Sequence, residues 1–335
     1  MARIGLDSGV GRFHRRLGLA TALLQILIAL SGLGLLWQAP LERLAAPDHY
    51  RISGETRIAP DAYVATARRA MKPGERLASL TLQQGSNPVV VTLRGADTRR
   101  LFLDPPTGRL LASAREEDGL SRFHAGLWIP GVGRWLVGGA GVLLLLSVTS
   151  GLWRWASMGR ARKGRRARGN ALPMRWHARS GPWATVPILT MALSGVALAF
   201  AGSGGDARDT SAGAAAMPAS RTTLSADRAV ASARHWSRGR LIGVDWPGVR
   251  APDWTIRLAG DGDGAGTVTI KVADDSASAV SAPARDLPAI TSWARRMHRV
   301  ADGAPLWRIL GSLAGLLILW QAATGLALGV RRARR

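Results

Sequence analysis

Four long apolar stretches, separated by polar segments, dominate the pattern of the chain. Each is close to the ~20 residues that a helix needs to cross the hydrocarbon core of a bilayer. We therefore predict transmembrane helices at residues 17–38, 134–156, 182–201 and 307–330. The first stretch is too long for the apolar part of a cleavable signal peptide, and no A-x-A-like site follows it. We expect it to remain as a helix.

The two long segments between these helices, residues 39–133 and 202–306, have the pattern of small α+β modules. In each, one helical segment precedes several short runs of aliphatic and β-branched residues, with Gly, Pro and Asp at the turns. The predicted helices are residues 60–71 and 224–237. The predicted strands are residues 79–82, 89–93, 100–103, 109–112, 241–246, 254–258 and 268–272.

Positive charge gathers next to the predicted spans. The chain has 45 Lys and Arg against 22 Asp and Glu, and residues 157–181 contain no acidic residue. Residues 1–16 and 331–335 are also basic, so the positive-inside rule places these three segments in the cytoplasm. Both termini are then cytoplasmic, and residues 39–133 and 202–306 face the opposite side. Topology and contact with anionic membrane lipid explain the basic segments, so we expect no nucleic-acid partner.

Cysteine is absent and tryptophan is common, with 13 residues. The absence of cysteine excludes a disulfide, a thiolate-bound iron–sulfur cluster and the C-x-x-C-H attachment of c-type haem. A metal centre in this chain must therefore use histidine, methionine or oxygen ligands. Many of the tryptophans fall near predicted span ends, where an aromatic belt is expected and no functional role is needed.

The spans belong to an internal repeat that keeps the histidines in register. Arg12-Phe13-His14 and Arg175-Trp176-His177 open the first and third spans at an offset of 177 − 14 = 163. Before the second and fourth spans, Arg122-Phe123-His124 and Arg296-Met297-His298 match at an offset of 298 − 124 = 174. The same two offsets relate further short matches: Ala29-Leu30-Ser31-Gly32 with Ala192-Leu193-Ser194-Gly195, and Gly151-Leu152 with Gly325-Leu326. The chain is therefore a duplicated membrane protein.

Four of the six histidines occupy equivalent positions in the two halves. Because the halves have the same topology, an axis along the membrane normal relates them, and the histidines of each matched pair lie at one depth. Two imidazoles on opposite sides of that axis are what a six-coordinate haem requires. The alternative is four ordinary interfacial histidines, and the paired register favours ligation over it. The two remaining histidines have no partner in the repeat and are interpreted as surface residues: His49 and His235.

Small and basic residues near the histidines have two interpretations each. Gly18 and Gly181 lie four residues after their histidines, so they either leave room for a porphyrin or allow close helix packing. For the Ser-Gly pairs at 31–32 and 194–195 we favour packing. The arginines are either partners of haem propionates or ordinary charges at span ends. The main candidates for propionate contacts are Arg15, Arg179 and Arg299.

These motifs, together with the turn Asp104-Pro105-Pro106-Thr107-Gly108, resemble the PepSY-associated transmembrane family over nearly the whole chain. The resemblance implies an integral membrane α-helical fold, in which two parallel two-span repeats form a four-helix bundle with two periplasmic α+β PepSY-like modules. Members with matched histidines resemble iron-regulated ferric-siderophore reductases of the bacterial inner membrane, which hold two b-type haems within four helices. By this resemblance the haem ligands are His14, His124, His177 and His298.

The sequence departs from the pattern of this family in two places. Where the first loop has its proline-containing turn, the second has Asp274-Asp275-Ser276. Pro130 follows His124, with glycines on both sides of Val132, and predicts a break in the helix that leads into the second span.

We therefore expect a di-haem membrane protein that reduces a ferric siderophore in the periplasm. Siderophore oxygens hold Fe(III) more firmly than Fe(II), which makes reduction useful for iron uptake. No G-x-G-x-x-G motif follows a strand and opens a helix, so we expect electrons from quinol or from a separate reductase. The alternative is a haem-free scaffold whose periplasmic modules bind partner proteins. Peptidase motifs are missing, and the middles of the spans lack the ionisable residues expected of a transporter.

Overall fold

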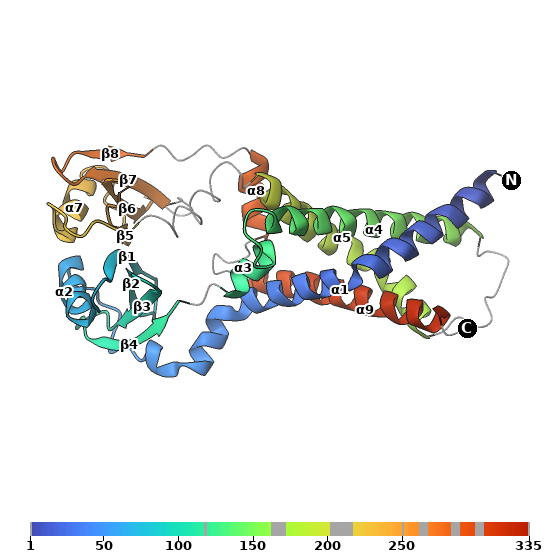
Figure 1. The fold of residues 1–335 in the computed structure, drawn as a ribbon, viewed down its shortest axis with the longest axis horizontal. Coiled ribbons are helices and arrows are strands. Elements are labelled where there is room, and N and C mark those ends of the chain that lie inside the picture. Colours follow the sequence, from blue (N-terminus) through green and yellow to red (C-terminus); the bar gives the residue numbers. More distant parts are fainter. Residues whose placement is uncertain are drawn as a thin grey trace. The chain divides into compact units, whose positions relative to one another are not determined.

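The computed structural model describes residues 2–116, 119–161, 172–201, 217–249, 251–260, 267–282, 289–298 and 305–333 (Figure 1). The chain divides into two compact units. The helical unit consists of Met1–Ala39, Asp118–Asp206 and Leu287–Arg335, and the sheet unit of Pro40–Glu117 and Ala207–Asp286. The centre of the predicted basic loop, residues 162–171, lies outside the described residues.

Four helices are long and apolar enough to cross a membrane, which confirms the four predicted spans. They are α1 (Ala2–Ala45), α4 (Gly133–Ala161), α5 (Leu172–Ala201) and α9 (Pro305–Ala333). All four extend beyond the apolar stretches that predicted them. The first and third repeat histidines therefore lie inside α1 and α5, one or more turns from the helix ends, instead of in the connecting segments.

A short helix precedes the second span, and another precedes the fourth: α3 (Gly119–Gly126) leads to α4, and α8 (Ala289–His298) leads to α9. The predicted interruption after α3 is confirmed, since Leu127, Trp128 and Gly131 have positive φ angles of 52°, 58° and 74°. The proline in this segment has no backbone N–H to donate to a continuing helix. The break lets α3 carry its histidine at a different angle from α4.

The helix packing in the helical unit follows the internal repeat of the sequence. A Cβ on Gly141 of α4 would lie 2.6 Å from Val196 of α5, and one on Gly315 of α9 would lie 2.8 Å from Leu33 of α1. Gly141 and Gly315 are related by the offset of 174, and Leu33 and Val196 by the offset of 163. These glycines allow two equivalent close helix crossings. The buried Gln25 side chain adds a hydrogen bond of 2.7 Å to the carbonyl of Ala140.

The two long loops build one antiparallel sheet of eight strands in the order β4-β3-β2-β1-β5-β6-β7-β8. The first loop supplies β1 (Arg76–Leu82), β2 (Val89–Arg94), β3 (Thr98–Leu103) and β4 (Leu110–Arg115). The second supplies β5 (Leu241–Asp245), β6 (Asp253–Ala259), β7 (Thr267–Ala273) and β8 (Ala279–Ser281). We predicted two modules but not their junction, where β1 pairs with β5 and Leu80 lies opposite Val244. The short strand β8 was also not predicted.

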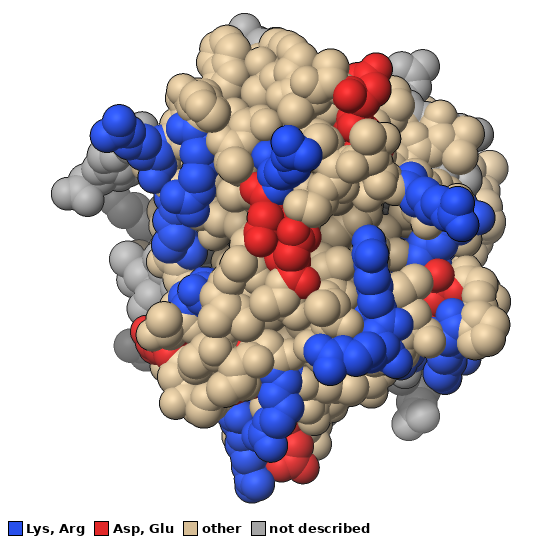
Figure 2. Space-filling view, turned by 90° about the vertical axis from the view of Figure 1, so that its left-hand side faces the viewer, with Lys and Arg blue, Asp and Glu red and all other residues tan. Residues whose placement is uncertain are grey.

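Helices α2 (Pro60–Ala70) and α7 (Ala226–Ala233) complete the core of the sheet unit. Tyr63 of α2 is fully buried with inward-facing strand residues such as Leu80 and Ile256. Phe102 of β3 stacks on His49 of the 3-10 helix η1 (Pro47–Tyr50), with ring centres 4.6 Å apart. His49, interpreted from the sequence as a surface residue, is half-buried by this contact. Figure 2 shows basic and acidic side chains interspersed over the face that it draws.

Candidate functional site: two facing histidine pairs

The four histidines of the repeat form two facing pairs. In the helical unit, His14 of α1 faces His177 of α5, with ring centres 6.2 Å apart. His124 of α3 faces His298 of α8, with ring centres 6.0 Å apart. Each pair takes one histidine from each half of the chain, as the register of the repeat predicted. The structure thus brings together residues that are far apart in sequence, at the two offsets of the repeat.

The two pairs lie at different depths of the helical unit. The imidazole of His124 rests against Gly32 of α1, which follows His14 on the same helix at a spacing of 32 − 14 = 18. At about 1.5 Å per residue this separates the two levels by about 27 Å, close to the ~30 Å thickness of a hydrocarbon core. The second half repeats the spacing, because His298 rests against Gly195, and 195 − 177 is again 18. One pair therefore belongs near each membrane surface.

Each histidine ring is held by a hydroxyl side chain that the sequence analysis did not assign to the site. In every case the contact joins the histidine Nδ1 to the hydroxyl oxygen of a Ser or Thr on a spanning helix. The four contacts are His14 with Ser150 at 3.2 Å, His124 with Ser31 at 3.0 Å, His177 with Thr324 at 2.9 Å and His298 with Ser194 at 3.2 Å.

A glycine follows each of these hydroxyl residues and lies against the edge of the same ring. A Cβ would come within 2.9 Å of the histidine Cε1 at Gly32 and Gly151, and within 3.0 Å at Gly195. At Gly325 the same distance is 3.6 Å, an ordinary contact. We favoured helix packing for Ser31-Gly32 and Ser194-Gly195, and the structure shows what packs there: a short helix contacts the span through its histidine, α3 on α1 and α8 on α5. These pairs receive a histidine ring.

Backbone carbonyls fix the proton on two of the rings. Nδ1 of His14 lies 2.9 Å from the carbonyl oxygen of Ser147, and Nδ1 of His124 lies 3.0 Å from that of Ile28. A carbonyl oxygen can only accept, so Nδ1 must carry the hydrogen and donate it. The neutral imidazole then has its free lone pair on Nε2, which is the form that binds a metal. Both rings lie ready to use Nε2 as a ligand atom.

Gly18 and Gly181 lie in open surroundings. The nearest heavy atom to a Cβ would be Ser147 Oγ at 4.0 Å for Gly18, and Gln321 Nε2 at 3.9 Å for Gly181. Close helix packing would bring backbone or side-chain atoms nearer than this, as it does at Gly141. The structure therefore does not use these two glycines for a tight helix crossing.

The predicted arginines are placed unevenly. Arg15 and Arg179 are exposed, and Arg299 lies outside the described residues. Arg154 of α4, which the sequence analysis counted only as a topology charge, is half-buried and donates a hydrogen bond of 3.4 Å to the carbonyl of Gly11. It lies four residues after Ser150 on the same face of α4, and its side chain touches α1 three residues before His14. Its repeat position, at the offset of 174, is Leu328, so the sequence repeat gave no signal for it.

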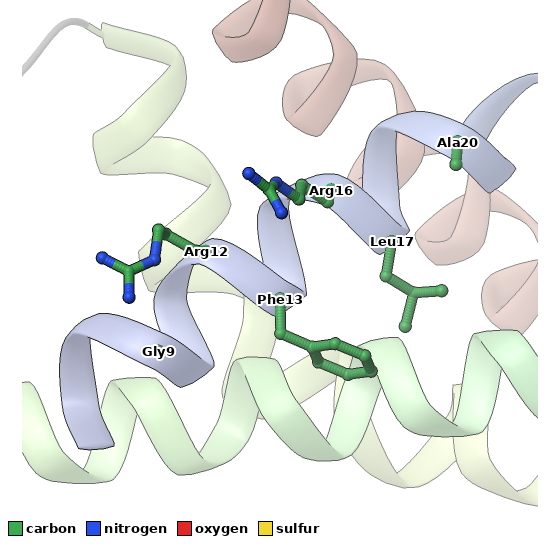
Figure 3. A pocket seen from close by; sticks show the side chains of 6 residues that line it. All are labelled: Gly9, Arg12, Phe13, Arg16, Leu17 and Ala20. Atoms are coloured by element: carbon green, nitrogen blue, oxygen red, sulfur yellow. The ribbon is translucent and has the colours of Figure 1, made fainter. Parts of the chain in front are cut away.

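A shallow pocket on α1 is separate from the histidine pairs. Its lining residues, Gly9, Arg12, Phe13, Arg16, Leu17 and Ala20, recur at intervals of three and four and share one face of the helix (Figure 3). His14 and Gly18 are not among them and lie toward the other side. Arg12 and Arg16 therefore point away from the His14 ring and are poorly placed to act on it.

The ligand set limits what these sites can hold. Among the residues described, no three or more His, Cys, Asp or Glu side chains come together to hold a metal ion. Each histidine pair offers two imidazoles, and no acidic side chain of the described residues joins them as a further ligand. A bare metal ion would therefore lack most of its ligands, whereas a group that brings its own equatorial ligands would need only two from the protein.

The sequence matches the family described as the PepSY-associated TM region over residues 12–335. No curated protein sequence matches the chain. Since the family match covers nearly the whole length, including all four spans and both loops, the chain belongs to this family of membrane proteins.

Proposed function

We propose that this member of the PepSY-associated transmembrane family is a di-haem electron-transfer protein. One b-type haem lies between His14 and His177, and the other between His124 and His298. The observation that carries the proposal is the facing of two histidine pairs, one from each half, at two depths of one bundle. When bound, haem supplies one-electron redox chemistry, and two axial imidazoles favour electron transfer over oxygen binding.

The spacing of the rings fits an iron atom between them. A metal–imidazole bond is about 2.0 Å long. With bonds near 1.33 Å, each nitrogen of the five-membered ring is about 1.1 Å from its centre. Two rings on opposite sides of one iron therefore have centres about 6.2 Å apart, against 6.2 Å and 6.0 Å in the structure. The open space at Gly18 and Gly181 supports room for a porphyrin beside the first pair.

Basic side chains offer partners for haem propionates. Arg154 is the best placed at the first pair, because its half-buried side chain lies against α1 at Gly11, near His14. Arg134 and Arg308, which the offset of 174 relates, lie at the starts of α4 and α9 and so near the level of the second pair. Charge-assisted hydrogen bonds from guanidinium to carboxylate would hold and orient the porphyrin. Arg15, Arg179 and Arg299 remain candidates by sequence alone.

The distribution of charge supports a direction for electron flow. If the basic segments are cytoplasmic, the first histidine pair lies near the cytoplasmic face of a bacterial inner membrane and the second near the periplasmic face. The sheet unit is then periplasmic. We propose that quinol or a separate reductase supplies electrons, and that a ferric siderophore or related ferric chelate accepts them. Iron held by hard oxygen ligands is released more easily once it is Fe(II).

A reduced-minus-oxidised spectrum with a pyridine haemochrome assay on the detergent-purified protein tests the haem sites. We expect a b-type spectrum and two haems per chain. His14→Ala and His298→Ala should each remove one haem, and His235→Ala, on an exposed residue of the sheet unit, should remove none. The reduced protein should then be reoxidised by a ferric siderophore. A colourless protein from haem-replete cells would contradict the proposal and favour a haem-free scaffold that binds periplasmic partners.

A further inference from the structure

We infer that four Ser/Thr-Gly steps in the spanning helices are positioning elements that fix the ring plane of the haem histidines and support the tautomer with the hydrogen on Nδ1. This inference rests on the proposed function. The steps are Ser31-Gly32, Ser150-Gly151, Ser194-Gly195 and Thr324-Gly325. None of these residues touches the iron, so their effect is exerted through the imidazole.

The hydroxyl groups act as acceptors toward the histidines. Each hydroxyl has one hydrogen, and in all four steps it has a carbonyl of the preceding helical turn to donate to. The distances from the hydroxyl oxygen to the carbonyl oxygen are 2.9 Å from Ser31 to Ile28, 3.0 Å from Ser150 to Ser147, 2.7 Å from Ser194 to Thr190 and 2.7 Å from Thr324 to Trp320. The hydroxyl oxygen is then left to accept the Nδ1 hydrogen, which His14 and His124 share between the hydroxyl and a backbone carbonyl. Nε2 remains unprotonated at all four positions.

The glycine fixes the orientation of the ring. With no side chain at this position, Cε1 of the ring can lie directly on the helix surface, with Nδ1 and Nε2 on either side of it. The hydroxyl holds the Nδ1 side by a hydrogen bond, and the helix backbone blocks rotation of the ring toward it. Together they leave Nε2 on the side of the ring away from the hydroxyl, available as the ligand atom. Hydrogen bonds from groups that do not touch the metal orient metal-binding histidines and raise their basicity.

The steps are arranged crosswise within each half of the chain. In the first half, α4 holds His14 through Ser150, and α1 holds His124 through Ser31. In the second half, α9 holds His177 through Thr324, and α5 holds His298 through Ser194. Each facing pair, however, joins the two halves. We call the pair of His14 and His177 the inner site, and the pair of His124 and His298 the outer site. The inner site therefore depends on the steps of α4 and α9, and the outer site on those of α1 and α5.

Helix packing alone is the competing explanation. Serine and glycine are common at contacts between membrane helices without any functional role. If packing were their purpose, substitutions would weaken the whole bundle and would not distinguish the two sites. The crosswise arrangement makes a prediction that packing does not: each substitution affects one haem and spares the other.

The hydroxyl test uses Ser31→Ala and Ser150→Ala in the full-length, haem-loaded protein, read by spectroelectrochemical titration. Both variants should keep two haems per chain. In Ser31→Ala only the outer haem should shift its midpoint potential, and in Ser150→Ala only the inner one. The shift should be upward, because a less basic imidazole stabilises Fe(III) less. Ser31→Thr, which keeps a hydroxyl as Thr324 does, should restore the original potential.

Ser312→Ala is the matched control, because this serine of α9 bonds Trp37 and its own helix instead of a histidine. It should leave both potentials unchanged. The glycine test compares Gly151→Ala, where the Cβ would lie 2.9 Å from His14 Cε1, with Gly325→Ala, where the distance to His177 is 3.6 Å. The first should reduce the haem content from two to one, and the second should keep two. Gly139→Ala, in open space on α4, controls for a general effect on the helix.

The outcomes separate the inference from the proposed function. A wild-type protein without haem contradicts both. A wild-type protein with two haems, but Ser-to-Ala variants whose potentials are unchanged or shifted at both haems together, contradicts only the positioning role. So does an equal loss of haem in Gly139→Ala and Gly151→Ala. Size-exclusion elution of each variant as a single species shows whether a change reflects the site or a failure to fold.

Discussion

Two aspartates anchor equivalent segments of the sheet unit. Asp104, after β3, accepts hydrogen bonds from the backbone N–H of Ser53 at 2.7 Å and from its hydroxyl at 2.6 Å. Asp274, after β7, accepts from the backbone N–H groups of Thr223 and Leu224 and from the indole of Trp254. Each carboxylate ties a turn to the segment that precedes a helix. The second loop therefore keeps the function of the turn although it lacks the prolines.

Replacing Asp104 should weaken the sheet unit in a pH-dependent way. Burial raises the pKa of Asp104, but hydrogen bonds from Ser53 and Thr107 outweigh it, so the pKa lies below its ordinary 3.8. A lowered folded pKa gives stability that is present above pH 3.8 and is lost as the pH falls through the folded value. Asp104→Asn should cost about 1–3 kcal/mol at neutral pH and flatten this acid dependence.

Pulse proteolysis with pepsin across a urea series, between pH 2 and pH 6, measures this change. The exposed Asp97→Asn is the control, because its ion pair with Arg115 is on the surface and should contribute less than about 1 kcal/mol. Equal urea midpoints for the two variants at every pH would contradict the anchoring role of Asp104. The remaining acid dependence in Asp104→Asn is assigned to Asp274 and Glu75, whose pKa values are also lowered by hydrogen bonds that outweigh burial.

The open space at Gly18 and Gly181 allows a second test at the residue scale. The Cβ of a side chain at either position would meet no atom closer than 3.9 Å, so a leucine there would extend into the space beside the first histidine pair. Gly18→Leu and Gly181→Leu should therefore fold and keep the outer haem, but lose the inner one. Pyridine haemochrome assays should give one haem per chain in each variant and two in Gly139→Leu. Two haems in both site variants would show that the porphyrin does not occupy this space.

At the residue scale the sequence predicted the facing histidine pairs better than the side chains that hold them. The four histidines stood out because each pair keeps the same neighbours at a fixed offset. Ser31 and Ser194 were visible in the repeat, but a Ser-Gly pair in an apolar span also suits helix packing. Ser150 and Thr324 differ in residue type, so only the glycines after them matched. Which side chain faces which ring depends on how the helices pack, and no local pattern encodes that.

Helices α2 and α7 cap each other at the element scale. The carboxylate of Asp61 accepts a hydrogen bond of 2.9 Å from the backbone N–H of Ala226, and that of Asp227 accepts one of 3.1 Å from the backbone N–H of Asp61. Residue 59, at the N-cap position of α2, is an alanine and offers no side-chain acceptor, so the partner helix supplies it. Burial, followed by the nearby charge of Asp61, raises the pKa of Asp227. The capping thus brings two carboxylates together.

Substitutions at Asp227 should separate capping from repulsion. Asp227→Ala leaves the first turn of α2 without its acceptor and should cost about 0.5–2 kcal/mol. Asp227→Asn keeps an acceptor oxygen and removes the charge, so it should match or exceed the stability of the wild type at neutral pH. Because the folded pKa is raised, the wild type loses stability as the pH rises from 3.8 through that value, and Asp227→Asn should not. Urea midpoints from pH 3 to pH 7 measure both effects.

The junction of β1 with β5 shows where prediction of the elements ends. Most of the predicted strands have one obvious partner within the same loop, because a short turn joins them. The pairing of Leu80 with Val244 joins strands from different loops, with two spanning helices between them in the sequence. Hydrophobic alternation shows that β1 and β5 have buried faces but does not identify a partner for their edges. The elements were therefore predictable, and the single sheet was not.

At the scale of the whole molecule, duplication places one site near each membrane surface. Each half contributes one histidine to each site, so neither half forms a complete site alone. The two levels, about 27 Å apart along α1, are close to the ~30 Å thickness of a hydrocarbon core. The proposed electron transfer needs the two ends of the bundle to face different compartments, and the basic segments predict which end faces the cytoplasm.

Cysteine labelling tests this orientation directly, since the chain contains no cysteine of its own. Gln84→Cys, exposed in the turn between β1 and β2, and Arg175→Cys, exposed near the start of α5, report the two sides. A maleimide that does not cross the inner membrane should label Gln84→Cys in spheroplasts, and Arg175→Cys only after lysis. The buried Ser237→Cys controls for accessibility. The reverse pattern would place the sheet unit in the cytoplasm, and it would exclude a periplasmic ferric chelate as the acceptor at the second histidine pair.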